Sequence, residues 1–484
     1  MKKFELVFIP MPGMGHLVST VEMANILLTR NPRLAITLLA IKSPFDSKAS
    51  HYIQSLSASV STNSLRFIVL PEPPPRQEQS EDFVLKEALV SYKLQVREAV
   101  AKLTESSQTQ LVGFVLDMFC MAMIDVAKEF EVPCYAFYTS GAGYLDFSLH
   151  LQELYSQNNS NEVVQQLQNS DVELGLLSFV NPVPSKLIPG IFSFEKAAVW
   201  LHEQAKRLRS EIKGVLVNTF VEMEPHVLNS MSSRSASQPI PLLYPVGPIL
   251  QLKKVDSDGS SADVLKWLDD QPRSSVVFLC FGSRGSFGKD QVEEIALALE
   301  RSGLRFVWSL RRPPPEGTIE APSDYATFED VLPKGFLDRT SEVGRVIGWA
   351  PQVEILAHPA TGGFVSHCGW NSTLESMWYG VPMATWPMYA EQMFNAFELV
   401  VELGLAVEIT IDYHNDFCKE KARIVSAEEI ESGIKRLMDE DNEIRKKVKA
   451  KSEECRKAIL EGGSSFVSLG HFIDDVLANS PRGE

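Results

Sequence analysis

Residues 349–392 read WAPQVEILAHPATGGFVSHCGWNSTLESMWYGVPMATWPMYAEQ, and this stretch decides the fold. Short apolar runs at 363–368 and 381–386 alternate in it with helix-forming runs at 353–357, 372–379 and from 391 onward. This alternation predicts consecutive β-α units on a parallel sheet. Polar residues gather where the predicted strands end, which is where open α/β sheets bind ligands. The stretch is rich in tryptophan and has no lysine or arginine, so it predicts a ligand with a ring to stack and an anion held without side-chain cations.

Length and composition limit the possible classes of protein. A chain of 484 residues is too long for one ordinary core and suits two domains. The formal net charge of −16 argues against a nucleic acid or an anionic membrane as partner, because both need a basic face. A phosphate ligand would have to be held by local dipoles against this overall field.

The cysteines and the two ends of the chain indicate a compartment. The six cysteines lie mostly in apolar runs without metal-type spacing, which predicts buried free thiols in a reducing environment. The chain opens on a strand-like run without the features of a signal peptide. The last apolar run, 466–477, contains Asp474 and Asp475 and is too short to span a bilayer. We therefore expect a soluble cytoplasmic protein without stable membrane insertion.

The first half of the chain begins with a β-α-β pattern. A strand at 4–10, a turn, a helix from 16 to about 30 and a strand at 35–41 follow one another. Gly13 and Gly15 favour close approach of the backbone to a ligand at the helix start. Val18 stands where a dinucleotide fingerprint needs its third glycine, which argues against an NAD site. Further strands are predicted at 64–70, 111–116, 134–138 and 214–218, and the polar segment 152–170 is predicted to be a surface excursion that shapes an acceptor pocket.

A linker at 245–261, with turn residues and charge but no periodicity, precedes a second β-α series. That series has a strand at 275–283, a helix at 289–301 and a strand at 305–310, then the stretch 349–392. Helices at 426–439 and 441–460 and a terminal helix after 465 follow it. Two such series predict an α/β protein with two Rossmann-like domains, whose parallel sheets face a cleft.

Two residues of the first half are candidates for acid-base chemistry. His16 stands where a glycine turn becomes a helix, and an imidazole there can take a proton near neutral pH. The helix N-terminus disfavours its charged form, which would keep the free base available. Asp117 ends a predicted strand and either caps the next helix or orients His16 as its carboxylate partner. From the residues alone, a packed or capping histidine is an open alternative.

The second half offers an anion site. Residues 367–372 read as strand end, glycine turn and helix start, where backbone N–H groups and the helix dipole favour an anion. Glu375 follows Ser372 by three residues, so it either completes a capping box or accepts hydrogen bonds from ribose hydroxyls. His367 and Cys368 are adjacent on a predicted strand and point to opposite faces, which argues against a thiol nucleophile.

The stretch 349–392 also resembles, residue for residue, the nucleotide-sugar signature box of plant UDP-dependent glycosyltransferases. WAPQ, HCGWNS and Glu375 carry the resemblance, which extends from PGMGH at 12–16 to EGGSS at 461–465. It implies the GT-B fold. Residues 1–250 would form an N-terminal acceptor-binding domain, 251–460 a C-terminal UDP-sugar-binding domain, and 461–484 a helix that crosses back to the first domain.

The resemblance also implies a role for each matched residue. His16 would be the general base, in contact with the acceptor, and Asp117 the carboxylate that orients it. The donor site would hold uracil with Trp349, Ala350 and Gln352, the ribose with Glu375, and the diphosphate with Ser283, His367, Asn371 and Ser372. Trp370, Asn371, Thr139, Glu391 and Gln392 would lie near the sugar, and Ala390 would border the acceptor. Many family members have aspartate where this chain has Glu391, which is a small departure.

The implied activity is that of an inverting UDP-glucosyltransferase. It would transfer glucose from UDP-glucose to a hydroxyl of a small lipophilic plant metabolite, such as a flavonoid, another phenolic or a terpenoid, and give a β-glucoside. Gln392 favours glucose within the family; UDP-galactose, UDP-xylose or another donor and a non-catalytic nucleotide-sugar binder stay open as alternatives. We expect a monomer that needs no cofactor. We also expect no metal, because Glu354, Glu375 and Glu391 are the only acids of the stretch 349–392 and none is paired at Asp-x-Asp spacing.

Overall fold

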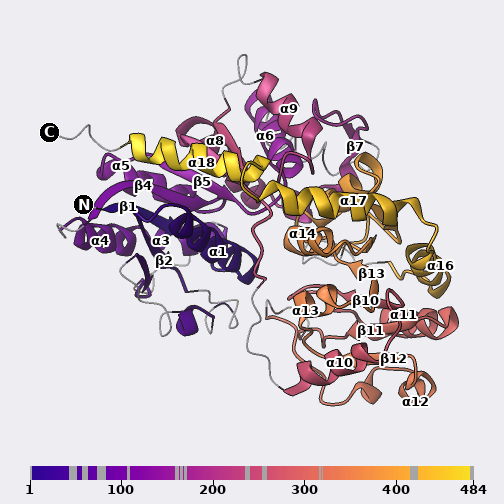
Figure 1. Cartoon of the computed structure of the whole chain (residues 1–484). Helices are drawn as coiled ribbons and strands as arrows, with labels where there is room; N and C mark the ends of the chain where they lie inside the picture. Colours follow the sequence, from indigo (N-terminus) through magenta and orange to yellow (C-terminus); the bar gives the residue numbers. More distant parts are fainter. Residues whose placement is uncertain are drawn as a thin grey trace.

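The chain folds into two parallel α/β units joined side by side (Figure 1). The computed structural model of the protein describes residues 3–42, 49, 52–56, 64–73, 83–105, 109–158, 163, 167, 172–234, 240–252, 259–315, 318, 320–414 and 423–479. Both sheets are parallel throughout, and the predicted fold class of two Rossmann-like domains is confirmed.

The first sheet has the strand order β3-β2-β1-β4-β5-β8-β9. Its strands are β1 (Lys3–Ile9), β2 (Leu34–Ala40), β3 (Leu65–Val69), β4 (Thr109–Asp117), β5 (Cys134–Tyr138), β8 (Gly214–Val217) and β9 (Leu242–Pro245). The order reverses between β1 and β4, and in open α/β sheets ligands bind beyond the strand ends at such a switch point. His16 lies at the start of α1, which follows β1, and Asp117 is the last residue of β4.

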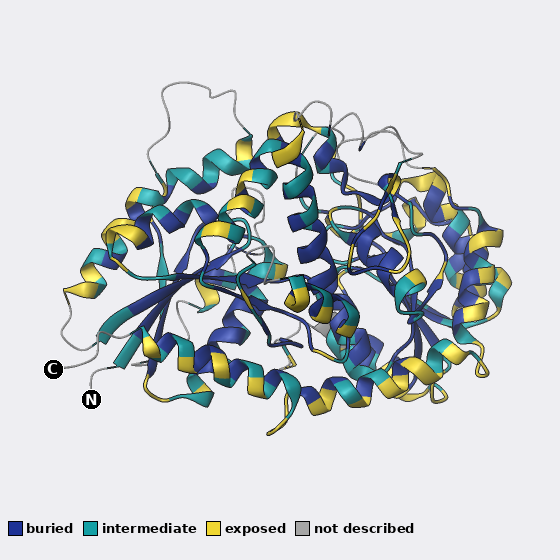
Figure 2. Ribbon diagram, turned by 90° about the horizontal axis from the view of Figure 1, so that it is seen from above, coloured by how far each residue is buried: buried dark blue, intermediate teal, exposed yellow. Residues whose placement is uncertain are grey.

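Helices cover both faces of this sheet, as Figures 1 and 2 show. They are α1 (Met14–Arg30), α3 (Val84–Ser91), α4 (Lys93–Thr104), α5 (Ile124–Glu129), α6 (Ala142–Gln157), α8 (Glu195–Glu211) and α9 (Pro225–Arg234). The prediction of a surface excursion from residue 152 is wrong for its first part. Residues 152–157 continue α6, and Gln152 and Tyr155 are buried, because apolar neighbours at helical spacing extend the buried face of the helix.

The second sheet has the order β12-β11-β10-β13-β14-β15. Its strands are β10 (Val276–Cys280), β11 (Arg305–Ser309), β12 (Gly344–Ile347), β13 (Thr361–Ser366), β14 (Met383–Thr385) and β15 (Ala406–Glu408). The associated helices are α10 (Gly259–Asp269), α11 (Lys289–Ser302), α12 (Phe336–Thr340), α13 (Gln352–Ala357), α14 (Trp370–Tyr379), α15 (Gln392–Phe397), α16 (Ala427–Met438) and α17 (Glu443–Ala458). The switch point lies between β10 and β13, which places Ser283 and His367 at neighbouring strand ends.

Burial explains why the strands read as continuous apolar runs. Every residue of β2, β10 and β13 is buried, as expected for parallel strands covered by helices on both faces (Figure 2). Five cysteines are buried free thiols, as predicted, and Cys418 lies outside the described residues. A search of the described residues finds no helix with the length and apolar character that a membrane crossing requires.

The last helix, α18 (Ser464–Ala478), returns to the first domain (Figure 1). Phe472 is fully buried there, with its ring centroid 5.0 Å from that of Tyr135 and 5.5 Å from that of Tyr244. The hydroxyl of Tyr135 donates a hydrogen bond of 2.6 Å to Asp475. These contacts fasten the end of the chain to the first sheet.

A buried pair of carboxyl groups lies where the two domains meet. Glu224, just before α9, accepts hydrogen bonds from the backbone N–H groups of Ala142 (3.0 Å) and Gly143 (2.6 Å) at the start of α6. Glu398 follows α15 in the second domain, and a Cβ added to Gly143 would fall 2.8 Å from its carboxylate oxygens. Both carboxyl groups are fully buried. Burial, and then the neighbouring carboxylate of Glu224, raise the pKa of Glu398 well above its ordinary value.

This pair predicts a pH-dependent stability. Because the folded-state pKa of Glu398 is raised, its contribution to stability is present below the ordinary glutamate pKa and is lost as the pH rises through the raised value. Glu398→Gln should therefore raise the melting temperature relative to wild type at about pH 8 and have little effect at about pH 5. Thermal melts across this range would measure it, with the exposed Glu408→Gln as a matched control. A difference in melting temperature that does not change with pH would contradict the raised pKa of Glu398.

Candidate active site

The predicted base and its carboxylate partner lie side by side at the switch point of the first sheet. His16 is in the first turn of α1, behind the N-cap Gly13, and its Nδ1 is 2.7 Å from Oδ2 of Asp117. Asp117 is buried, and its other oxygen accepts a hydrogen bond of 3.0 Å from the backbone N–H of Phe119. It does not cap the next helix, whose N-cap is Cys120 without a side-chain hydrogen bond. A fixed carboxylate on Nδ1 orients the ring and leaves Nε2 to take a proton.

Burial and two nearby carboxylates act in opposite directions on the pKa of His16. Burial lowers the pKa of His16, but the carboxylates of Asp117 and, more weakly, Glu391 outweigh this, so the pKa is raised from its ordinary value. The helix N-terminus, which favours the neutral imidazole, is thus opposed by two nearby negative charges, and the expectation that it keeps the free base available stays a prediction. A base with a raised pKa also holds the abstracted proton more firmly.

This geometry predicts how the pH profile changes with the carboxylate. Asp117→Asn should slow turnover, and it should also move the acid limb of the kcat/KM profile to lower pH, because the pKa of His16 falls without its negative neighbour. Initial rates across pH 5 to 9 would measure both effects. Asp269→Asn, which alters an exposed aspartate 3.1 Å from His358, is the matched control. An unshifted acid limb would contradict the assignment of that limb to His16.

Thr139 and Phe119 complete the surroundings of the base. The hydroxyl of Thr139, just after β5, is 2.9 Å from Nδ1 of His16. The ring of Phe119 lies 5.6 Å from the imidazole and stacks on Trp200 at 5.7 Å. The prediction that Thr139 reaches the sugar stays a prediction; the structure places its hydroxyl on the base.

In the second domain, three predicted donor-site residues form one polar network. Nε2 of Gln352, at the start of α13, donates hydrogen bonds to Oγ of Ser372 (2.8 Å) and to Oε2 of Glu375 (2.7 Å) on α14. The capping-box alternative is excluded, because α14 begins at Trp370 behind the N-cap Gly369, and Ser372 is already inside the helix. Burial first, and then the charge of Glu354, raise the pKa of Glu375 to about 7. When this carboxyl group ionises, both of its oxygens can accept hydrogen bonds from hydroxyl groups.

His367 lies between two glycine turns beyond the strand ends. A Cβ added to Gly282 or Gly369 would fall 2.4 or 2.6 Å from its Nε2, so only glycine allows the backbone to approach this ring. Burial lowers the pKa of His367 to about 4, so the ring is neutral and can offer a hydrogen bond but no charge. Its Nδ1 is buried without a hydrogen-bond partner among the described residues. This unpaired nitrogen is available for a hydrogen bond to a ligand group at this turn, close to Ser283 after β10.

The prediction that Cys368 lies on a strand is wrong. β13 ends at Ser366, and Cys368 adopts a left-handed backbone conformation with φ of 61°. Burial raises the pKa of its thiol to about 12. The thiol is therefore protonated at neutral pH, and a cysteine nucleophile is excluded on these grounds.

The predicted uracil site exposes an indole ring. Trp349 is 45% exposed, whereas most large hydrophobic side chains are buried, and Ala350 beside it is buried. The guanidinium of Arg311, just after β11, lies 5.2 Å from the centre of the indole ring and 2.9 Å from a carboxylate oxygen of Asp324. Sequence reasoning missed Arg311, because the residue lies outside the stretch 349–392; its place directly after a strand end is the only signal that could have found it.

Trp370 and Asn371 connect the two domains. The indole N–H of Trp370 donates a hydrogen bond of 2.7 Å to the carbonyl of Asn218, and the Asn371 side chain donates one of 3.0 Å to the carbonyl of Gly15. The hydroxyl of Ser19 on α1 donates to the amide oxygen of Asn371 at 3.2 Å. The helix start that should hold the diphosphate is therefore tied to the turn that carries the base. Their contacts with a sugar or a diphosphate stay predictions.

The acid-amide pair that closes the signature stretch faces the base from the second domain. Glu391 is the N-cap of α15, and burial raises its pKa while the nearby His16 lowers it. Oε1 of Gln392 accepts hydrogen bonds of 3.0 Å from the backbone N–H groups of Met388 and Tyr389, so this oxygen holds its own turn. Ala390 is exposed and adopts a left-handed conformation with φ of 54°. The roles of Glu391 and Gln392 in reading the hexose stay predictions.

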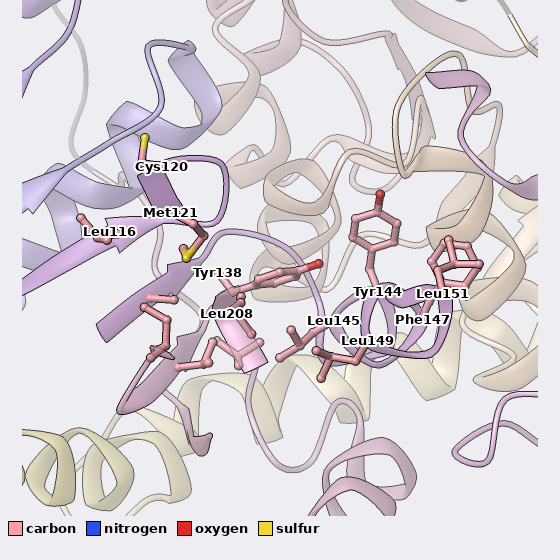
Figure 3. Close-up of a cluster of buried hydrophobic side chains, with 14 of the residues drawn as sticks. Leu116, Cys120, Met121, Tyr138, Tyr144, Leu145, Phe147, Leu149, Leu151 and Leu208 are labelled. Atoms are coloured by element: carbon pink, nitrogen blue, oxygen red, sulfur yellow. The ribbon is translucent and has the colours of Figure 1, made fainter. Parts of the chain in front are cut away.

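A mostly apolar pocket lies beside the base. Its walls are mostly apolar side chains of the first domain. Tyr138, Leu145, Leu149 and Leu208 line it, and Figure 3 shows these four side chains near one another. Phe119 lines the pocket and contacts His16, which places the base at its border. Gln152, Tyr155 and Phe192 are among the residues that line it.

Within the described residues, no group of three or more His, Cys, Asp or Glu side chains is placed to hold a metal ion.

Comparisons with known proteins identify the family. A family model described as "UDP-glucoronosyl and UDP-glucosyl transferase" matches residues 54–442. UDP-glucose flavonoid 3-O-glucosyltransferase 6 from Fragaria ananassa is 52% identical over 98% of this chain and 99% of its own length. Anthocyanidin 3-O-glucosyltransferase 1 from Manihot esculenta is 50% identical over 96% and 100%, respectively.

Solved structures show the same relationship. A transferase from Siraitia grosvenorii in complex with UDP is 54% identical, with a TM-score of 0.87 over 98% of this chain and 100% of that one. UGT71G1 from Medicago truncatula, complexed with UDP-glucose, is 42% identical, with a TM-score of 0.85 over 98% of both chains. Because the family model covers most of the chain and the relatives match nearly all of it, the chain belongs to the plant UDP-dependent glycosyltransferases, which are hexosyltransferases of the GT-B fold.

Proposed function

We propose that this protein is an inverting glucosyltransferase that transfers glucose from UDP-glucose to a hydroxyl of a small lipophilic plant metabolite. The acceptor is a flavonoid, another phenolic or a terpenoid, and the product is its β-glucoside. The observation that carries the proposal is the His16–Asp117 pair, with 2.7 Å between its nearest atoms, at the border of an apolar pocket. The names of two relatives, which specify flavonoid and anthocyanidin glucosyl transfer, support the acceptor class.

The mechanism is a single displacement. Nε2 of His16 takes the proton of the acceptor hydroxyl while the hydroxyl oxygen attacks the anomeric carbon of glucose. The bond from this carbon to the UDP oxygen breaks, and the electron pair leaves with UDP. One in-line displacement converts the α-linked donor into a β-glucoside. Asp117 stabilises the imidazolium that forms, as a carboxylate does for a histidine base in other enzymes.

The second domain would stabilise the leaving group with dipoles. The turn 367–369 and the start of α14 direct backbone N–H groups toward a diphosphate, and the hydroxyls of Ser372 and Ser283 add donors. Neutral His367 contributes a hydrogen bond without a charge that would need desolvation. Gln352 and Glu375 would hold the ribose and the base edge, with uracil on Trp349.

Donor and acceptor are tested together. The purified protein is incubated with UDP-glucose, UDP-galactose or UDP-xylose and a panel of plant phenols and terpenoid alcohols, and products are identified by mass spectrometry. We expect glucose to be the preferred donor by roughly 1–3 kcal/mol over galactose, because one misplaced hydroxyl leaves a polar group unpaired. Faster turnover of UDP-galactose would overturn the glucose assignment. Binding of UDP-glucose without transfer or hydrolysis would favour a non-catalytic binder.

We further propose that the reaction needs no divalent metal and no cofactor. After dialysis against EDTA, the rate with UDP-glucose and an accepted phenol should be unchanged, because preorganised dipoles stabilise the departing diphosphate. Initial rates before and after dialysis, and after addition of Mg²⁺ or Mn²⁺, measure this. Activity that disappears and is restored by either ion would mean that the phosphate site has been misread.

The protein is also proposed to act as a cytoplasmic monomer whose partners are the UDP-sugar and the acceptor alone. Its net charge of −16 argues against nucleic acid. Light scattering on the purified protein would test the monomer.

A further inference from the structure

Three polar groups in the apolar pocket have no hydrogen-bond partner among the described residues. They are Oε1 of Gln152 and the hydroxyl of Tyr155 on α6, and Nδ1 of His202 on α8. All three residues line the pocket beside the base. Gln152 and Tyr155 are 7% and 6% exposed, so open solvent does not satisfy them. Buried polar groups in native proteins nearly always have a partner, and an unmade hydrogen bond is costly.

These groups lie far from the base along the pocket. Thr139, which contacts His16, precedes α6 by two residues, so the base lies near the start of this helix at Ala142. With a rise of about 1.5 Å per residue, Gln152 and Tyr155 lie roughly 15–20 Å further along the helix axis. The rings of Tyr155 and His202 are 5.5 Å apart, so the two helices place their polar groups together.

The side chains between the base and these groups are mostly apolar. Leu145 and Leu149 on α6 and Leu208 on α8 line the pocket there, and Figure 3 shows them facing Tyr138. A ligand that fills this space therefore meets apolar walls along its length. Tyr138 and Ser148, which also line the pocket, already hydrogen-bond to each other at 3.2 Å, and the unpaired groups lie at the distal end.

We propose that the acceptor carries a second, uncharged hydrogen-bonding group at the end opposite the glycosylated hydroxyl, and that Gln152, Tyr155 and His202 bind it. This inference rests on the glucosyl transfer proposed above and narrows its acceptor to long, flat molecules with polar groups at both ends. A hydroxyl or a carbonyl fits this distal polar site, whereas a carboxylate does not.

The chemistry of the three side chains supports an uncharged group. Burial raises the pKa of Tyr155 to about 12, so its hydroxyl is neutral and can donate or accept. Burial, and then the nearby Lys206, lower the pKa of His202, so the imidazole is neutral as well. Nε2 of Gln152 donates to Oγ of Ser156 at 2.7 Å; if the amide were turned over, its nitrogen would be the unpaired atom instead. In either orientation one amide atom stays available.

Matched acceptors test the inference. The probes are 4-hydroxystilbene and 4,4′-dihydroxystilbene, rigid molecules that differ only in the distal hydroxyl. For wild type we expect kcat/KM to be about 20- to 100-fold higher for the diphenol, where its two equivalent hydroxyls alone would give about twofold. Dissociation constants of both stilbenes, measured calorimetrically with the enzyme saturated with UDP, should show the same preference.

Variants assign the preference to the distal site. Tyr155→Phe and Gln152→Leu should each reduce the ratio between the two acceptors several-fold, and the double variant should bring it close to twofold. Tyr144→Phe removes a hydroxyl from the same helix nearer its start, and it should keep the wild-type ratio. UDP affinity, measured for each variant, verifies that the second domain is folded.

The outcomes separate the inference from the proposed function. Equal binding and equal transfer for the two stilbenes would overturn the distal polar site while leaving glucosyl transfer in place. The same holds if Tyr144→Phe lowers the ratio as much as Tyr155→Phe does. A clear binding preference without transfer to either stilbene would support the distal site and count against glucosyl transfer.

Discussion

His16→Ala is expected to lower the turnover of glucosyl transfer by about two to four orders of magnitude, the usual contribution of a general base. The acceptor hydroxyl would then have to lose its proton to water, which a closed apolar pocket does not supply. UDP-glucose affinity should change little, because the donor residues are on the second domain. Steady-state rates and calorimetric titration with UDP-glucose would measure the two quantities separately.

The chain offers a matched control for this variant. His358 also pairs with an aspartate, Asp269, at 3.1 Å, but Asp269 is largely exposed and lies away from the strand ends of the first sheet. His358→Ala should keep the wild-type rate. If His16→Ala were equally active, a different group would be the base and the site would have to be reassigned.

Glu375→Gln is expected to weaken UDP-glucose binding by about 10- to 100-fold, because a ribose hydroxyl loses its charged acceptor. In wild type the affinity should also depend on pH. The pKa of Glu375 is about 7 without ligand, and the donor favours the ionised carboxylate. The affinity should therefore fall as the pH drops below about 7, by up to tenfold per pH unit. UDP-glucose suits this measurement because, unlike UDP, it lacks a terminal phosphate that titrates near neutral pH.

The comparison variant for Glu375 is Glu354→Gln on α13. Glu354 raises the pKa of Glu375 through its charge, so its removal should shift the pH dependence to lower pH without abolishing it. Glu375→Gln should remove the dependence altogether. A wild-type affinity that is flat between pH 5.5 and 8 would contradict the role of Glu375 at the ribose.

Much of the fold could be predicted from the sequence, because buried parallel strands read as apolar runs. The predicted strand at 134–138 coincides with β5, and the helix predicted at 289–301 differs from α11 by one residue. Strands β12 and β15 were missed, since each is only three or four residues long.

The site was predictable where the signal is local and was missed where it depends on the fold. His16, Gln352 and Glu375 stand in motifs of contiguous residues, so their neighbours identify them. By contrast, Glu224 and Glu398 look like ordinary surface acids in the sequence, and only the meeting of the two domains buries them. The polar end of the pocket likewise requires α6 and α8 to be packed together before it exists.

The predicted base and donor site come from different domains, and the contact of Asn371 with Gly15 and Ser19 joins them. The proposed mechanism puts the base on one side of the sugar and the leaving diphosphate on the other, which requires inversion at the anomeric carbon. The anomeric configuration of the product therefore tests this arrangement directly.

The most direct measurement is the anomeric configuration of the product formed from UDP-glucose and an accepted phenol. Proton NMR of the purified glucoside distinguishes the two anomers by the coupling of the anomeric proton, and spectra taken early in the reaction exclude later isomerisation. Attack by the acceptor that His16 deprotonates predicts the β-glucoside alone. An α-glucoside as the first product would contradict the single displacement and the assignment of His16 as its base.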